Sequence, residues 1–222
     1  MRKVIAGAVA GLALGAMSAV SAVDIGAGIM GSFSSDFGGG VEGKIPMLGN
    51  EGFEVKMGWV GGGIKGFFDV TYAEVGIGVT FGSGAIEMKE TGFAGGLSDK
   101  VNYSFTALNF GLLGKYPIAL ADNIVLFPAA GIDYQLVLSA KDEYGNDEDD
   151  AGDLSALWFK FGAGMDIALT DAIFLRTTLL YGIRLANKME NDFVNELKMP
   201  GVNVNSRLGH GLTVNLGIGF KF

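Results

Sequence analysis

Cysteine is absent from this sequence of 222 residues, and histidine occurs once. These two counts argue against disulfide frameworks, thiol catalysis and zinc sites. Basic residues are also scarce, since 16 Lys and Arg stand against 24 Asp and Glu and give a net charge of −8. We therefore expect no nucleic-acid partner, because proteins that bind nucleic acids normally carry a basic surface.

Proline is rare, with four residues, whereas glycine is abundant, with 37. Glycine is thus about one residue in six, where about 7% is usual. The chain is nevertheless 49% hydrophobic and 11% aromatic. That composition argues against both a disordered and a collagen-like chain.

The first 22 residues have the layout of a secretory signal peptide. Arg2 and Lys3 are followed by an uncharged apolar stretch over residues 4–17 and by small residues, with Val20 and Ala22 in the −3 and −1 positions of a cleavage site. An uncleaved membrane anchor is the alternative, because residues 4–23 carry no charge. We expect residues 1–22 to be a signal peptide and residues 23–222 to form one domain without a helical membrane span.

Apolar and polar residues alternate along the rest of the chain with a period of two, which indicates strands with two unlike faces. The last segment is the clearest case, and one of its faces carries only Leu212, Val214, Leu216, Ile218, Phe220 and Phe222. The same pattern predicts seven earlier strands, near residues 23–34, 52–68, 72–88, 103–117, 123–140, 155–169 and 172–187. Within residues 52–68 the alternation reverses at residues 61–63, three glycines at which we expect a β-bulge.

The connections between these strands alternate in length. Short turns are expected near residues 69–71, 118–122 and 170–171, and long polar loops near residues 35–51, 89–102, 141–154 and 188–209. Eight antiparallel strands with short turns at one end and long loops at the other form an up-and-down barrel. The fold class predicted is all-β, an eight-stranded antiparallel up-and-down transmembrane β-barrel.

The residues on the polar faces of the strands indicate whether the apolar faces point outward or into the lumen. Their charged residues, of nearly balanced sign, are Asp24, Glu54, Lys56, Lys65, Asp69, Glu74, Lys115, Asp133, Lys160, Asp166, Arg176, Arg184 and Lys221. Balanced charges are expected where groups are enclosed together, because an unpaired buried ion is costly. Glycines beside them leave room for long side chains in a narrow lumen. We predict that these residues form a charge network in the lumen and that the apolar faces contact lipid. A soluble exported barrel with the opposite orientation is the alternative.

The last strand ends on a C-terminal phenylalanine, and in this it resembles the terminal strand of bacterial outer-membrane β-barrels. The signal peptide, the eight strands and the loop layout together resemble the small-barrel group of OmpX, the OmpA barrel and OmpW, over residues 23–222. The resemblance implies export to the bacterial outer membrane, contact with its lipid, and recognition by the barrel-assembly machinery through Phe222, Phe220 and Ile218.

The expected function is that of a non-enzymatic barrel with a lumen filled by side chains, whose loops serve structural, adhesion or interaction roles toward an extracellular partner. OmpW-like passage of small hydrophobic molecules is the alternative, with a pocket lined by Met30, Phe127, Trp158, Phe174 and Leu180. A lipid-modifying enzyme is the third possibility. It would depend on His210, which we expect to point outward near the loop rim without a partnered nucleophile.

Two glycine-rich segments resemble nucleotide-binding motifs only superficially. Residues 26–31 fit G-x-G-x-x-G but lie within a predicted strand, and residues 38–44 lack the Ser or Thr and the helix that complete a P-loop. We therefore expect no cofactor.

The third long loop is strongly acidic, with seven acids and one base over residues 141–153. Such oxygen ligands suit divalent cations, but their spacing does not match a calcium-binding loop. We expect a solvated charge run there and no dedicated metal site.

Overall fold

The computed structural model describes residues 24–45, 51–91, 98–148, 150–187, 192, 194–195 and 202–222. The expected signal peptide, residues 1–22, lies outside the described residues. No helix within this described part of the chain has the length and apolar character needed to cross a membrane.

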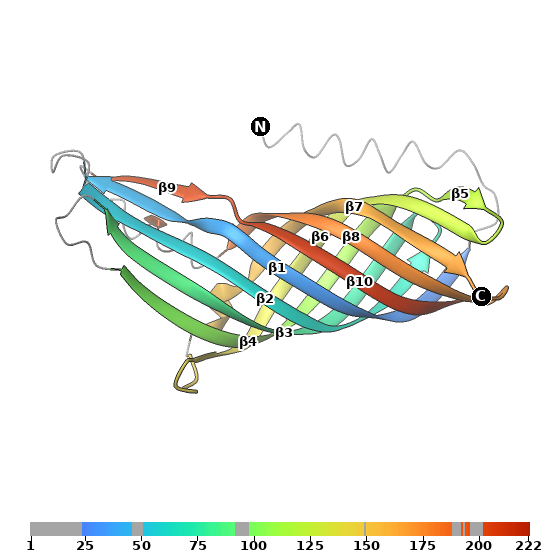
Figure 1. Ribbon diagram of the computed structural model, residues 1–222, viewed down its shortest axis with the longest axis horizontal. Coiled ribbons are helices and arrows are strands. Elements are labelled where there is room, and N and C mark those ends of the chain that lie inside the picture. The colour runs from blue at the N-terminus through green and yellow to red at the C-terminus, as the bar shows by residue number, and fades with distance from the viewer. Residues whose placement is uncertain are drawn as a thin grey trace.

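Eight long strands form one antiparallel sheet that closes on itself. They are β1 (Ile25–Ile45), β2 (Glu51–Val70), β3 (Ala73–Thr91), β4 (Ser98–Lys115), β6 (Ile124–Asp142), β7 (Ala156–Ala168), β8 (Ile173–Asn187) and β10 (His210–Lys221). Each pairs with the next in this order, and β10 pairs with β1, which completes the barrel (Figure 1). Short strand β5 (Ile118–Ala121) pairs with β6, β9 (Asn203–Arg207) pairs with β1, and the 3-10 helix η3 (Ala151–Leu154) precedes β7. The predicted eight-stranded antiparallel barrel is confirmed.

Four neighbouring strands are longer than the alternation predicted. Strands β1 to β4 have 18 to 21 residues, whereas β7 and β10 have 13 and 12. Figure 1 shows them, with β9 beside β1, continuing past β7, β8 and β10 as a one-sided sheet. We call this sheet the extension, formed by residues 39–45, 51–58, 84–91, 98–103 and 203–207. The expected loops 35–51 and 89–102 are therefore largely strand.

The reversed alternation in β2 does not come from a bulge. The pairing of β2 with β3 runs without a shift from Gly52 to Val70, so the bulge expected at residues 61–63 is wrong. The register shift lies instead in β1, between Asp36 and Gly39. Odd-numbered residues of β2 point inward along the whole strand, and they are apolar in the extension but polar or glycine in much of the barrel.

The apolar side chains of the barrel wall point outward, as predicted. Large apolar residues project outward on every long strand, and Ile64 and Leu216 are 68% and 65% exposed. The opposite faces of the same strands carry ionic groups and glycines. Most large apolar side chains of the wall therefore point away from the interior, while a smaller set, which includes Phe67, Phe127 and Phe174, packs inside the lumen.

Inward glycines are required where the lumen is crowded. A Cβ on Gly28 would lie 2.6 Å from the Phe67 ring and 2.7 Å from the Gly219 Cα atom, besides striking the Ile218 carbonyl. A Cβ on the outward Gly31 would meet only the Leu216 carbonyl oxygen, at 3.8 Å.

We predict that Gly28→Ala lowers the free energy of unfolding by about 1–3 kcal/mol, because backbone and ring must move apart. Gly31→Ala, on the same strand, should be neutral or stabilising by up to about 1 kcal/mol. Urea titration of both variants, refolded in detergent, measures the difference. Equal urea midpoints would contradict the close packing of the lumen.

Candidate functional site

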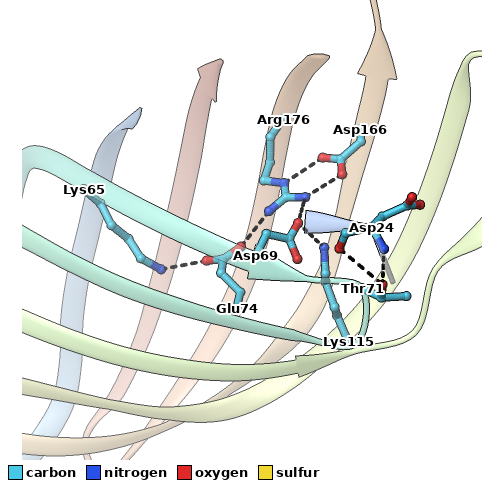
Figure 2. A network of polar contacts seen from close by, with 8 residues as sticks. All are labelled: Asp24, Lys65, Asp69, Thr71, Glu74, Lys115, Asp166 and Arg176. Atoms are coloured by element: carbon cyan, nitrogen blue, oxygen red, sulfur yellow. Dashed lines mark hydrogen bonds and ion pairs between the residues drawn. The ribbon is translucent and has the colours of Figure 1, made fainter. Parts of the chain in front are cut away.

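An arginine on β8 is the centre of the charge network in the lumen. Arg176 is 1% exposed and donates hydrogen bonds to three carboxylates, each on a different strand (Figure 2). Its distances are 2.5 Å to Asp69 Oδ2 on β2, 2.9 Å to Glu74 Oε2 on β3, and 2.7 and 2.5 Å to the two oxygens of Asp166 on β7. One guanidinium thus ties together opposite walls of the barrel.

Three phenylalanine rings surround the same guanidinium. Its Cζ atom lies 4.6 Å from the centroid of Phe67, 5.1 Å from that of Phe127 and 5.0 Å from that of Phe174. Cation–π contacts of this kind are strongest where water is excluded. The rings therefore screen the ionic cluster from water while still stabilising its positive centre.

Two lysines complete this cluster and balance its charge. The Lys65 amine donates to Glu74 Oε1 at 3.1 Å, and the Lys115 amine donates to Asp69 Oδ2 at 2.5 Å (Figure 2). With Arg176 they supply three positive charges against three carboxylates. A neutral, hydrogen-bonded cluster avoids most of the cost of burying an isolated ion.

Two further ion pairs lie along the lumen. Lys160 on β7 is 3.5 Å from Asp133 on β6, and Arg184 on β8 pairs with Asp36 on β1, with the Arg184 guanidinium over the Trp158 ring. Asp36 was missed by the sequence analysis, which assigned it to a loop. Its even number, which continues the inward parity of Met30 and Ser34, was the available signal.

All but two of the predicted network residues line the lumen or its mouth. Asp24 and Lys221 border the cavity at the short-turn end, where the Asp24 amide donates to Thr71 Oγ1 at 2.9 Å. Glu54 and Lys56 are the exceptions and lie on the outer face of the extension, so their predicted place in the lumen is wrong. The lumen contains five bases, Lys65, Lys115, Lys160, Arg176 and Arg184, and they are matched by five acids, Asp36, Asp69, Glu74, Asp133 and Asp166.

Three small cavities lie in the lumen between the described residues. A cavity of about 90 Å³ lies at the short-turn end, beside Asp69, Lys115 and Arg176. Two others, of about 30 and 20 Å³, lie near Asp133 and Lys160. Spaces of this size can hold one or a few water molecules.

The residues proposed for a hydrophobic pocket do point into the lumen, where they pack against other side chains. Met30, Phe67 and Phe174 form one cluster, and Phe127 and Leu180 form another with Leu113 and Ala129. Trp158 is 3% exposed and lies beside Arg184. These contacts fill the space that an apolar ligand would need.

His210 faces outward at the loop end of the barrel, as predicted. Its Nδ1 atom is 2.7 Å from the Tyr181 hydroxyl, and its ring lies 6.3 Å from that of Phe37. Neither partner is a carboxylate or an aliphatic hydroxyl that would complete a hydrolytic site. Both belong to the aromatic rim of the outer wall.

The acidic segment forms a turn through its own carboxylate. Asp142 accepts hydrogen bonds from the Asn146 amide side chain at 2.8 Å, from the Asn146 backbone at 2.8 Å and from the Tyr144 backbone at 2.9 Å. The Asn146 side chain is the main cause of a lowered Asp142 pKa. Among the described residues there is no cluster of three or more Asp, Glu or His side chains that could hold a metal ion.

The outer face of the extension carries a second set of ion pairs, which we call the outer ion ladder. Arg207 on β9 donates to Glu42 at 3.0 Å and also bonds Glu54, and Lys56 lies 3.2 Å from Glu54. Lys89, 2.8 Å from Glu87, lowers the pKa of that carboxyl mainly through its hydrogen bond. The members of the outer ion ladder are Glu42, Lys44, Glu54, Lys56, Glu87, Lys89, Lys100 and Arg207.

The residues of the expected assembly signal lie on the strand that closes the barrel. On β10, Ile218 pairs with Ile29 and Phe220 with Ala27 of β1, and Phe222 follows at the chain end. Phe220 and Phe222 are exposed on the outer wall.

The chain matches no protein-family model and no curated protein. It is similar to solved structures of bacterial surface proteins at low sequence identity. Neisserial surface protein A is 9% identical with a TM-score of 0.45, over 87% of this chain and 97% of that one. The outer membrane protein OprG from Pseudomonas aeruginosa is 11% identical with a TM-score of 0.44, over 90% and 96%. The outer membrane protease OmpT from Escherichia coli is 10% identical with a TM-score of 0.37, over 92% and 99%.

The class of this protein follows from its own barrel. Eight strands close with an apolar outer wall and an ionic, side-chain-filled lumen. That is the architecture of the small outer-membrane barrels, so the expected resemblance is confirmed at the level of fold. At such low identities the solved structures indicate nothing beyond fold.

Proposed function

We propose that the protein is an integral barrel of the bacterial outer membrane, with a sealed lumen and with a working surface formed by the extension and its loops. The observation that carries this proposal is the inside-out distribution of side chains. Outward leucine, isoleucine, valine and phenylalanine residues cover the wall, while ten paired charged groups occupy the interior. Large contiguous apolar surfaces are rare on soluble monomers.

The height of the apolar wall also fits a bilayer. On β2 the outward residues are apolar or glycine from Val60 to Val70, and on β3 from Ala73 to Phe81. Tilted strands of about 9–11 residues span the hydrocarbon core. Charged outward residues begin above this height, at Lys56 and Glu87, where the extension would enter water.

The distribution of turns supports one orientation. The start of β1 and the end of β10 lie at the end of the barrel that has the short turns (Figure 1). Outer-membrane barrels place short turns in the periplasm and long connections outside. The extension, the outer ion ladder and the acidic turn would then face the exterior.

A sealed lumen favours structural, adhesion or interaction roles over passage of solutes. We propose that an extracellular partner would meet the extension and that the assembly machinery would meet the terminal strand through Ile218, Phe220 and Phe222. No chemical step is required of any residue in this function, and no cofactor.

We expect the mature protein to fractionate with the outer membrane and to migrate faster on a gel before boiling than after it, because the paired barrel resists detergent. Planar bilayers containing the folded protein should show no stepwise ion conductance, because the ion pairs block the lumen. A boiled sample is the control for both readouts. A water-soluble mature protein would overturn the membrane placement, and open channels would overturn the sealed lumen.

A further inference from the structure

The outer ion ladder is a basic surface on an acidic chain. Its five bases and three acids give it a net charge of +2, whereas the whole chain carries −8. The segment over residues 141–153, with seven acids and one base, is strongly negative. The protein therefore presents two exterior surfaces of opposite sign.

Five residues near the β9 edge of the extension form a linear chain of ion pairs. Lys44 is 2.8 Å from Glu42, which also accepts from Arg207 at 3.0 Å. Arg207 continues the chain to Glu54, and Glu54 lies 3.2 Å from Lys56. The chain thus begins and ends with a lysine, and three bases share two carboxylates. The Lys56 and Arg207 side chains are 47% and 46% exposed, whereas that of Glu54 is 16% exposed, so the outermost layer is positive.

The acidic turn, residues 142–148, lies at the opposite edge of the extension. It starts at Asp142, which pairs with Tyr103 on β4, and Figure 1 shows this turn, in yellow, beside β4, with β9 at the other edge. The hydrogen bonds of Asp142 and the bond from Asn102 to Glu143, at 3.2 Å, hold the turn in place. Four strand spacings of about 4.8 Å separate β4 from β9, so the turn does not reach the Arg207 of its own chain.

Both surfaces lie beyond the apolar wall, at the end of the barrel with the long connections. Copies inserted into one membrane in the same direction therefore hold the acidic turn and the outer ion ladder in the same layer outside the lipid. Contact between two different surfaces of identical chains is heterologous, and it continues into rings or rows. The acidic turn of one copy can thus meet the ladder of the next.

We propose that a second copy of this chain is the partner of the outer ion ladder. Glu143 and Glu148 of one copy contact Lys44 and Lys56 of its neighbour, and the exposed Tyr144 is covered between them. A lysine ammonium has three donors, so a lysine that bonds one carboxylate of its own chain can still donate to another. This inference rests on the proposed membrane placement and adds lateral self-association to it. Because exposed ion pairs contribute little singly, we expect a weak contact that salt disrupts.

The absence of cysteine permits a direct test by site-specific cross-linking. Two variants of the mature chain are refolded together into vesicles of zwitterionic phosphatidylcholine, one with Tyr144→Cys and one with Asn205→Cys, which is opposite Glu42 on β9. With a short bifunctional maleimide we expect at least fivefold more mixed dimer than from Asn205→Cys paired with Asn123→Cys, at the short-turn end. Two copies with Asn205→Cys should stay at this background.

Charge reversal tests whether the ladder makes the contact. Lys56→Glu in the Asn205→Cys copy should reduce the mixed dimer at least fivefold, whereas Lys221→Glu, an equal change at the short-turn end, should leave it unchanged. Glu148→Lys in the Tyr144→Cys copy should restore most of the yield against Lys56→Glu. Sodium chloride at 1 M should also reduce the yield, since it screens charges beyond about 3 Å. This salt series decides the result if Lys56→Glu does not fold.

A mixed dimer that persists after Lys56→Glu and in high salt would overturn the proposal. So would a dimer that forms only when an anionic glycolipid is added, because the lipid and not the second copy would then occupy the lysines. The gel shift on boiling is recorded for every variant. A protein that shows the shift but forms no mixed dimer contradicts only this contact, whereas a protein that never enters the vesicles contradicts the proposed function.

Discussion

Arg176→Met is expected to lower the free energy of unfolding by about 3–5 kcal/mol, the cost typical of breaking a buried ion pair from one side. Methionine keeps much of the apolar contact with Phe67, Phe127 and Phe174 but removes the donor that Asp69, Glu74 and Asp166 share. Three carboxylates would then remain in this cluster with only Lys65 and Lys115 to balance them. Urea titration of protein refolded in lipid vesicles, followed by the gel shift, measures the change.

Arg207→Met is the matched control for this prediction. Arg207 also bonds two carboxylates, Glu42 and Glu54, but its side chain is 46% exposed on the outer ion ladder. Exposed ion pairs contribute little, so we expect a much smaller shift of the urea midpoint than for Arg176→Met. If the two arginine variants unfolded at the same urea concentration, the lumen cluster would not be the main ionic support of the barrel.

Ile64→Arg is expected to destabilise the folded protein in lipid by about 2–4 kcal/mol, because the substitution places a charge near the middle of the hydrocarbon core. Ile64 lies within the outward segment from Val60 to Val70 and is 68% exposed. In a soluble barrel an arginine at so exposed a position would cost little. The urea midpoint in vesicles is the measurement, and thicker bilayers should not relieve the loss.

Tyr144→Arg provides the comparison, since Tyr144 is 82% exposed in the acidic turn beyond the barrel wall. We expect no measurable loss of stability there. A tolerated arginine at residue 64 would contradict the lipid-facing wall, and with it the orientation on which the proposed function depends.

Much of the barrel was predictable because the period of two repeats over eight segments. The outward position of residues such as Ile77, Leu112 and Leu216 was read correctly from that alternation. Balanced charges on the other face also indicated an enclosed lumen, and most of the predicted network residues do line it. Signals of this kind depend on local geometry alone, since successive side chains of a strand point to opposite faces.

The extension was misread because its surroundings differ from those of the wall. Val55 and Met57 point inward and are 5% and 7% exposed, so the apolar face of β2 changes sides between the extension and the barrel wall. In the sequence this change appears as a reversal of the apolar–polar alternation near residues 61–63, and a bulge would produce the same reversal. The strand is continuous there, and under the proposed membrane placement what changes is the medium outside it, from lipid to water.

The sequence by itself determined the number of strands, their antiparallel hairpin order and the orientation of the wall, because each follows from periodicity between near neighbours in the chain. Only the tertiary structure decided which charges meet. Arg176 is 107 residues from Asp69 and 102 from Glu74, and its contacts depend on barrel closure and on the stagger of the strands. The register shift in β1 and the extension likewise depend on how whole strands pair with one another, which no local pattern records.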